Sequence, residues 1–227
     1  MSDLLLSGNQ RLPDAVPLFP LPNVVLFPRA VLPLHIFEDR YRKMTADVLR
    51  THRQIAMALL KPGWEKDYYG RPPIEPVVCV GSILSHERLS DGRYNFLLQG
   101  HTRARVVGEL DAAEPYRQAR LQSLTESDGL EIDLAEARQR LVELFDRDAY
   151  AALPGGSQMR QLLATPNIPT SVIADLLAFN VLADEQVALK QSLLAECNVR
   201  LRVWRTLETI TALRPAWHNI PHDANLN

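Results

Sequence analysis

The side chains best suited to chemistry are scattered along this sequence, and none of them completes a catalytic motif. His86 and Glu87 begin a zinc-binding H-E-x-x-H pattern, but Ser90 stands where the second histidine would have to reach the same metal. None of the ten glycines precedes a lysine, so the phosphate-binding G-x-x-x-x-G-K loop is missing. No G-x-S-x-G nucleophile elbow is present. We therefore expect no catalytic residue, no metal site and no cofactor, and a chain that is not an enzyme.

The other histidines and the two cysteines fit structural roles. His86 and His101 could approach each other across neighbouring strands, but two imidazoles on the surface of a hairpin are the favoured interpretation. Cys79 lies in an apolar run and is expected to be a buried, inert thiol, because burial opposes ionisation. Cys197 is expected on the inward face of a helix. The pair forms no C-x-x-C motif, so neither a disulfide framework nor a zinc knuckle is expected.

Two groups of side chains are candidates for binding other molecules. Aromatic pockets beside an exposed strand edge suit an extended polypeptide segment. The candidates for peptide binding are Trp64, Tyr68 and Tyr69 in a long loop, and Tyr94 on a hairpin. Arginines interleaved with aromatic residues suit a nucleic-acid strand. The candidates for that alternative are Arg88, Arg93, Arg103 and Arg105. For the arginines, a solvated hairpin is the favoured interpretation, given the near-neutral charge of the chain.

The composition is that of an ordinary folded protein of 227 residues. Apolar residues make up 46% and the formal net charge is -2, which allows a sizeable core and disfavours a dedicated nucleic-acid domain. No apolar stretch approaches the roughly 18 residues needed to span a membrane. The apolar run at 4–6 is too short for a signal peptide. We expect a cytoplasmic protein that does not bind membranes. The sequence leaves oligomerisation open.

Residues 13–125 are expected to form a β-barrel domain that contains one helix. Proline is dense between 13 and 33, and it cannot donate a ladder hydrogen bond, so short edge or bent strands are predicted there. A closed or partly closed barrel accommodates such strands. The expected strands are 16–19, 24–27, 31–36, 55–60, 77–84, 94–98, 103–107 and 117–124. Asp91-Gly92 predicts a hairpin turn, and Phe37, Tyr41, Met44 and Val48 share one face of a helix.

Residues 130–214 are expected to form a small helical bundle, followed by a loose tail at 215–227. The apolar stripe of the first helix is Leu134, Ala137, Leu141, Leu144 and Phe145.

Helix starts in this part are marked by capping residues. The expected caps of the next three helices are Thr170 or Ser171, then Asp184, then Asn198. The last helix would carry Leu201, Trp204, Leu207 and Ile210 on its inward face. The joint at 127–129 is short, so the barrel and the bundle are expected to pack together, with a groove between them as the place for a bound peptide.

Two long blocks resemble the amino-terminal domain of Lon proteases. Residues 16–41 (VPLFPLPNVVLFPRAVLPLHIFEDRY) look like the opening of that domain, with Pro-Leu strands that lead into a helix. Residues 80–106 (VGSILSHERLSDGRYNFLLQGHTRARV) are similar to its middle hairpin. The family positions of that hairpin are matched by Gly81, Asp91, Gly92, Gly100 and Arg103. Residues 169–177 and 193–207 resemble its helical extension more weakly, and the likeness covers about 14–213.

The resemblance implies an α+β fold, a PUA-like β pseudobarrel followed by a helical bundle, and a role in recognising protein substrates. The chain ends at Asn227 with neither the ATPase nor the protease domain of Lon, so a stand-alone, non-catalytic module that binds polypeptide is expected. RNA binding, by analogy with PUA domains, and an unrecognised small hydrolase remain as alternatives.

Overall fold

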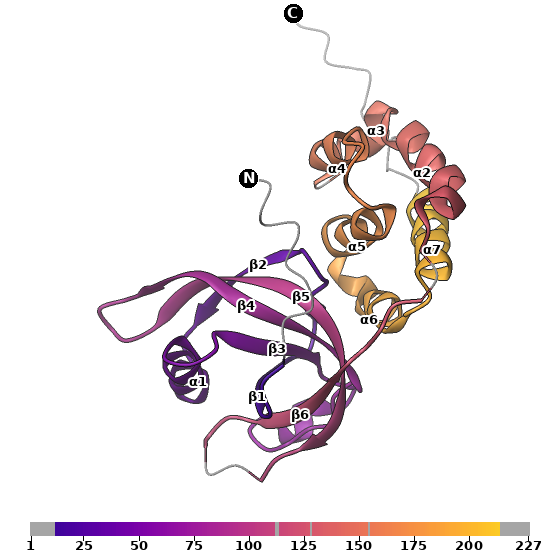
Figure 1. The fold of residues 1–227 in the computed structure, drawn as a ribbon. Coiled ribbons are helices and arrows are strands. Elements are labelled where there is room, and N and C mark those ends of the chain that lie inside the picture. The colour runs from indigo at the N-terminus through magenta and orange to yellow at the C-terminus, as the bar shows by residue number, and fades with distance from the viewer. Residues whose placement is uncertain (1–11, 112–113, 128, 154, 214–227) are drawn as a thin grey trace, which may run out of the picture.

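The computed structural model describes residues 12–111, 114–127, 129–153 and 155–213. The expected tail at 215–227 lies outside these ranges. Six strands and one helix come first along the chain, and a group of helices follows, with the two parts side by side (Figure 1). The predicted class, α+β with a β pseudobarrel, one helix and a helical bundle, is confirmed.

The sheet closes on itself. The order is β2-β5-β4-β3-β1-β6, and β6 also pairs with β5, so five strands form a ring and β2 lies outside it along β5. The strands are β1 (Val16–Leu21), β2 (Val31–Ile36), β3 (Gln54–Leu59), β4 (Val77–Arg88), β5 (Tyr94–Glu109) and β6 (Gln118–Ser123). Only the β1–β3 pair among these is parallel, which requires a crossover connection, and β2 and α1 (Asp39–Leu49) supply it.

The helix α1 packs against the ring through the residues that the periodicity indicates, with one exception. Tyr41, Met44 and Val48 are buried, and the Tyr41 ring lies 4.4 Å from that of Phe19, centroid to centroid. Phe37 was expected on the same face but precedes the helix and is 63% exposed. The helix begins only at Asp39, so the helical spacing does not extend back to Phe37.

Two other expectations for the β half were wrong. Residues 24–27 form no strand, although Val25, Leu26 and Phe27 are buried. Pro22 and Pro28 flank this run and remove two ladder donors, so it crosses the core as an extended segment without a partner strand. Residues 94–98 and 103–107 were expected as separate strands, but β5 is continuous through both, with irregular pairing that absorbs its bend.

The helical part contains α2 (Glu131–Phe145), α3 (Asp148–Ala151), α4 (Gly156–Leu163), α5 (Thr170–Asn180), the 3-10 helix η3 (Asp184–Gln186), α6 (Val187–Ala195) and α7 (Val199–Ala212). The predicted stripe of α2 is buried along its whole length, at Leu134, Ala137, Leu141, Leu144 and Phe145. It packs on α7 and α4, so the bundle has its own apolar core.

Helix starts were predicted with mixed success. Asn198 caps α7, and its side chain accepts a hydrogen bond of 2.9 Å from the Leu201 backbone N–H. Thr170 is the first residue of α5 and does not cap it. Glu131 takes that role from another helix, accepting from the Thr170 N–H at 2.8 Å and from its hydroxyl at 2.7 Å. Asp184 opens η3, and the cap position before it is Ala183.

Two inward assignments near α7 were wrong. Leu201 is 48% exposed, whereas Leu207 and Ile210 are buried as expected. Cys197 lies in the short connection between α6 and α7 and is only half-buried, because α6 ends at Ala195. The buried residues in the first turn of α7 are Val199 and Arg202, and Leu201 lies on the exposed side of that turn.

The two parts of the chain meet along a seam between the ring and helices α5, α6 and α7. Helix α6 lies nearest to the sheet and contacts β4 (Figure 1). The Gln191 amide on α6 donates a 2.9 Å hydrogen bond to the Val77 carbonyl at the start of β4. Ser127, at the start of the predicted joint, is bridged to Asn198 just before α7.

Candidate functional site

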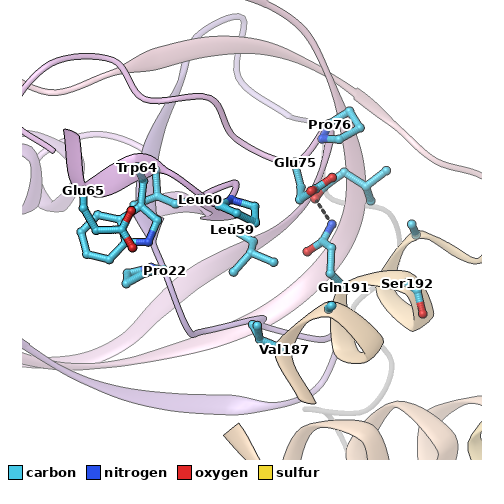
Figure 2. A pocket seen from close by; sticks show the side chains of 14 residues that line it. Pro22, Leu59, Leu60, Trp64, Glu65, Glu75, Pro76, Val187, Gln191 and Ser192 are labelled. Atoms are coloured by element: carbon cyan, nitrogen blue, oxygen red, sulfur yellow. Dashed lines mark hydrogen bonds between the residues drawn. The ribbon is translucent and has the colours of Figure 1, made fainter. Parts of the chain in front are cut away.

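An apolar groove lies where α6 faces the ring. It has a volume of about 580 Å³ and its walls come from three places in the chain. The end of β3 supplies Leu59 and the next residue Leu60, helix α6 supplies Val187 and Ala188, and the loop after β3 supplies Trp64 (Figure 2). A concave, mostly apolar surface with a few polar groups is the usual form of a binding site.

Local sequence explains why Trp64 reaches this groove. All six residues of β3 are buried, and the chain leaves the sheet after a bridge between Leu60 and Ile74. Gly63 then adopts φ +90°, a left-handed conformation that side chains rarely tolerate, and a 3-10 helix, η2 (Trp64–Asp67), follows at once. This turn directs the indole across Leu60 toward Pro22 (Figure 2).

The loop that carries Trp64, Tyr68 and Tyr69 is held in place by contacts on the side away from the groove. The rings of Trp64 and Tyr68 lie 5.5 Å apart, edge to face. The Tyr68 hydroxyl donates a 2.7 Å hydrogen bond to Glu38, and the Arg40 guanidinium lies 4.9 Å from the Tyr68 ring centroid. Burial and the bond to Glu38 raise the pKa of Tyr68. The loop is therefore anchored to the start of α1 and holds Trp64 in place.

Of the four aromatic candidates, the structure places only Trp64 in the groove. Tyr68 is half-buried and bonded to Glu38. Tyr69 is 87% exposed and borders a separate, more polar cavity beside Arg40. Tyr94, at 7% exposure, belongs to the core of the ring. The four residues thus do not form one surface.

The arginine candidates also separate. Arg88 and Arg93 are exposed near the hairpin tip, and Arg105 is exposed farther along β5. Arg93 is paired with Asp91 at 2.6 Å. Arg103 is 4% exposed and lies in the seam, against Asp175 and Glu126, so the expected four-arginine cluster on the hairpin does not form. Arg103 and Arg105 lie two residues apart on β5, and only Arg103 is covered by the helices; its partners lie far away in sequence.

Several residues of the groove carry no signal in the sequence. Val187, Ala188, Ser192 and Ala195 form the helical wall. Helix α6 has small and apolar residues on all sides, so its spacing does not separate a core face from a binding face. Glu65 and Glu75 complete the groove at its ends, and only the folded loop reveals that both border the same space (Figure 2).

The titratable groups with displaced pKa values lie elsewhere. Burial raises the pKa of the Cys79 thiol to about 12, in keeping with the inert thiol expected there. Burial, and to a smaller extent the Arg29 charge, lower the pKa of His101 to about 4. His101 borders a small seam cavity, not a hairpin surface, and it does not pair with His86, which lies opposite Phe96. Neither group faces the apolar groove.

Within the described ranges, no three histidine, cysteine or acidic residues gather as metal ligands would. Helices long and apolar enough to cross a membrane are likewise missing from the part of the chain that the structure describes.

Comparison with known proteins identifies the family. The model of the ATP-dependent protease La (LON) substrate-binding domain matches residues 15–212. The chain belongs to this family. Lon protease of Desulfosudis oleivorans is 27% identical over 202 residues, which is 86% of this chain and 23% of that protein. Lon protease 2 of Myxococcus xanthus is 26% identical over 217 residues, 92% of this chain and 25% of that protein. The chain thus spans about a quarter of these Lon proteases.

Solved structures share the fold. The N-terminal domain of the Mycobacterium avium complex Lon protease superposes with a TM-score of 0.66 at 16% identity, covering 88% of this chain and 100% of that one. The Lon N-terminal domain protein from Xanthomonas campestris gives a TM-score of 0.59 at 23% identity, covering 88% and 99%. These likenesses show that the chain has the fold of Lon N-terminal domains.

Proposed function

We propose that this Lon-type domain binds polypeptide in the groove between β3 and α6 and does no chemistry on it. The observation that carries the proposal is the half-buried Trp64, held over an apolar floor of Leu59 and Leu60 by a loop that is braced on α1. Aromatic side chains that fill such a position are typical anchors of protein partners. The family's name for the domain, substrate-binding, supports the same role.

The absence of catalytic activity is part of the proposal. Among the described residues the groove contains no histidine or cysteine, and its polar side chains are two carboxylates, an amide and a hydroxyl. The Gln191 amide already donates a hydrogen bond to the Val77 carbonyl (Figure 2). RNA binding is the less favoured alternative, because Arg103 is paired with Asp175 in the seam and is not exposed on the hairpin. A cytoplasmic location stays a prediction.

The test measures binding of unfolded, fluorescein-labelled peptides by anisotropy. We expect Trp64→Ala to weaken binding by about 2 kcal/mol, roughly thirtyfold in Kd, because it removes the anchor. Trp204→Ala is the matched control: Trp204 is also half-buried, but it lies on α7 beside Arg140, away from the groove. Ala188→Trp, which fills the groove from the helical side, should also weaken binding. Equal affinities for wild type, Trp64→Ala and Ala188→Trp would overturn the proposal.

A further inference from the structure

The groove has a one-sided charge. Fourteen residues line it, and the charged ones among them, Glu65 and Glu75, are both acids. In the described part of the chain, neither carboxylate takes part in an ion pair or a side-chain hydrogen bond. The acids of the seam behave differently, since the buried Asp175 and the exposed Glu126 both meet arginines. Both groove carboxylates can therefore pair with a cation that a bound partner supplies.

The backbone of Glu75 holds this acid next to the apolar floor of the groove. Its backbone N–H donates a 2.8 Å hydrogen bond to the Leu59 carbonyl, next to the bridge between Leu60 and Ile74. The residue is half-buried at the edge of the apolar floor, and its carboxylate has no side-chain partner among the described residues. A cation bound there would pair with it beside apolar surface, where a charge pair is screened less than in open water.

The two acids stand at different ends of the apolar floor. Glu65 lies beside Trp64 and Pro22, and Glu75 lies beside Pro76 near the start of β4, with Leu59 and Leu60 between them (Figure 2). The order along the groove is thus acid, apolar floor with an indole, acid. A segment that complements it has apolar side chains in the middle and positive charges on either side.

We infer that the groove selects polypeptide segments in which apolar residues are flanked by lysine or arginine. This inference rests on the function proposed above and narrows its substrate class. The phosphates of RNA carry the opposite sign and would be repelled by both ends of the groove. An acidic peptide with the same apolar centre would be repelled in the same way. The groove therefore distinguishes partners by their charge pattern as well as by their apolar content.

The experiment uses three peptides with one apolar centre, Leu-Phe-Leu, flanked on both sides by two lysines, two glutamines or two glutamates. Binding to the whole chain is measured by anisotropy at low and at high salt. At low salt we expect the lysine peptide to bind about fivefold more tightly than the glutamine peptide, and the glutamate peptide to bind most weakly. The preference should shrink at 0.5 M salt, because salt screens partly exposed charges.

Substitutions assign the preference to the two acids. We expect Glu75→Gln, and more so Glu65→Gln with Glu75→Gln, to remove the advantage of the lysine peptide over the glutamine peptide. Glu208→Gln is the control, because it removes the same charge from an exposed position on α7, outside the groove. Glu65 is exposed and Glu75 is half-buried without a side-chain partner among the described residues, so folding is expected to be unaffected.

The outcomes separate the two proposals. Equal, Trp64-dependent binding of all three peptides would overturn the charge preference and leave the groove as a binding site. A lysine preference that survives in the double variant would also overturn it, since other charges would then be responsible. Absence of Trp64-dependent binding by any peptide would overturn both. Displacement of bound peptide by an RNA oligomer at the Trp64 site would overturn the charge preference alone.

Discussion

Single glycines set how closely the segments of the ring approach each other. A Cβ on Gly100 would overlap the Phe27 carbonyl oxygen, so only glycine lets the extended run at 24–27 cross β5 at this point. The Arg29 N–H donates to the Gly100 carbonyl at 2.8 Å, and the Gly100 N–H donates to Ala30 at 2.9 Å. The glycine in the hairpin block that resembles Lon thus has a packing role, and Gly92, with φ +81°, has a turn role.

The role of Gly100 can be tested on one strand. We expect Gly100→Ala to lower the free energy of unfolding by about 1–3 kcal/mol, because backbone must move to admit the methyl group. Gly108 is the control, since a Cβ there meets nothing within 4 Å and the residue lies on the same strand. Gly108→Ala should change stability by less than about 1 kcal/mol. Urea unfolding of both variants checks this, and equal losses would contradict the packing role.

At the scale of helices and strands, seam contacts join the ring to the bundle through a buried charge network. Arg103 of β5 binds Asp175 of α5 at 2.5 Å and Glu126 at 2.7 Å, and its Nε donates to the Leu194 carbonyl at 3.0 Å. Arg202 of α7 approaches the same two carboxylates, at 3.0 Å and 2.8 Å. Burial alone would lower the pKa of Arg103, but Asp175 and Glu126 together outweigh it and the pKa is raised. The Arg103 guanidinium thus stays charged inside the seam.

Removing one carboxylate from this network leaves buried positive charge without its partner. We expect Asp175→Asn to lower the free energy of unfolding by about 3–5 kcal/mol. Glu136→Gln is the control, because it removes an acid from an exposed pair with Arg140 on α2, where about 0.5 kcal/mol or less is at stake. Thermal unfolding followed by circular dichroism provides the measurement. Similar small effects of the two changes would show that the network does not secure the seam.

At this scale the sequence predicts the features that depend on residues close together in the chain. The stripe of α2, the Asn198 cap, the bounds of β2 and the turn at Gly92 follow from spacing and local conformation, and the structure has them all. The inward turn of Arg103 depends on Asp175, 72 residues away, and no periodicity encodes that distance.

The same limit applies to the candidate site. Its location between barrel and bundle, and Trp64 within it, could be predicted from domain order and loop composition. The helical wall at 187–195 and the two acids could not, because their proximity exists only after folding.

For the molecule as a whole, a histidine in the seam makes stability depend on pH. His101 borders a cavity between ring and bundle together with Arg29, Arg103, Glu126 and Asp175. Burial, and to a smaller extent the Arg29 charge, lower its pKa to about 4, against about 6.5 for a free imidazole. Between those two values the unfolded chain binds a proton that the folded chain does not. Stability is therefore complete above about pH 6.5 and is lost as the pH falls toward 4.

We expect this histidine to account for about 2 kcal/mol of acid destabilisation over that range, after allowance for the solvent that reaches the ring. In His101→Gln that part of the slope should vanish, while the contribution of His52, whose pKa burial also lowers, remains. Urea unfolding at intervals from pH 7 to 4.5 measures the difference between variant and wild type. Parallel curves would exclude His101 as the source.

The groove has one wall on the ring and the other on α6, and this divided construction links occupancy to the integrity of the seam. A ligand that contacts both walls holds them at their folded spacing, so it stabilises the packing of the bundle on the ring. By mass action, a peptide at a hundred times its Kd would add about 2.7 kcal/mol to the resistance of the whole chain to unfolding. Loosening the seam, in turn, would weaken capture without any change to a residue that contacts the peptide.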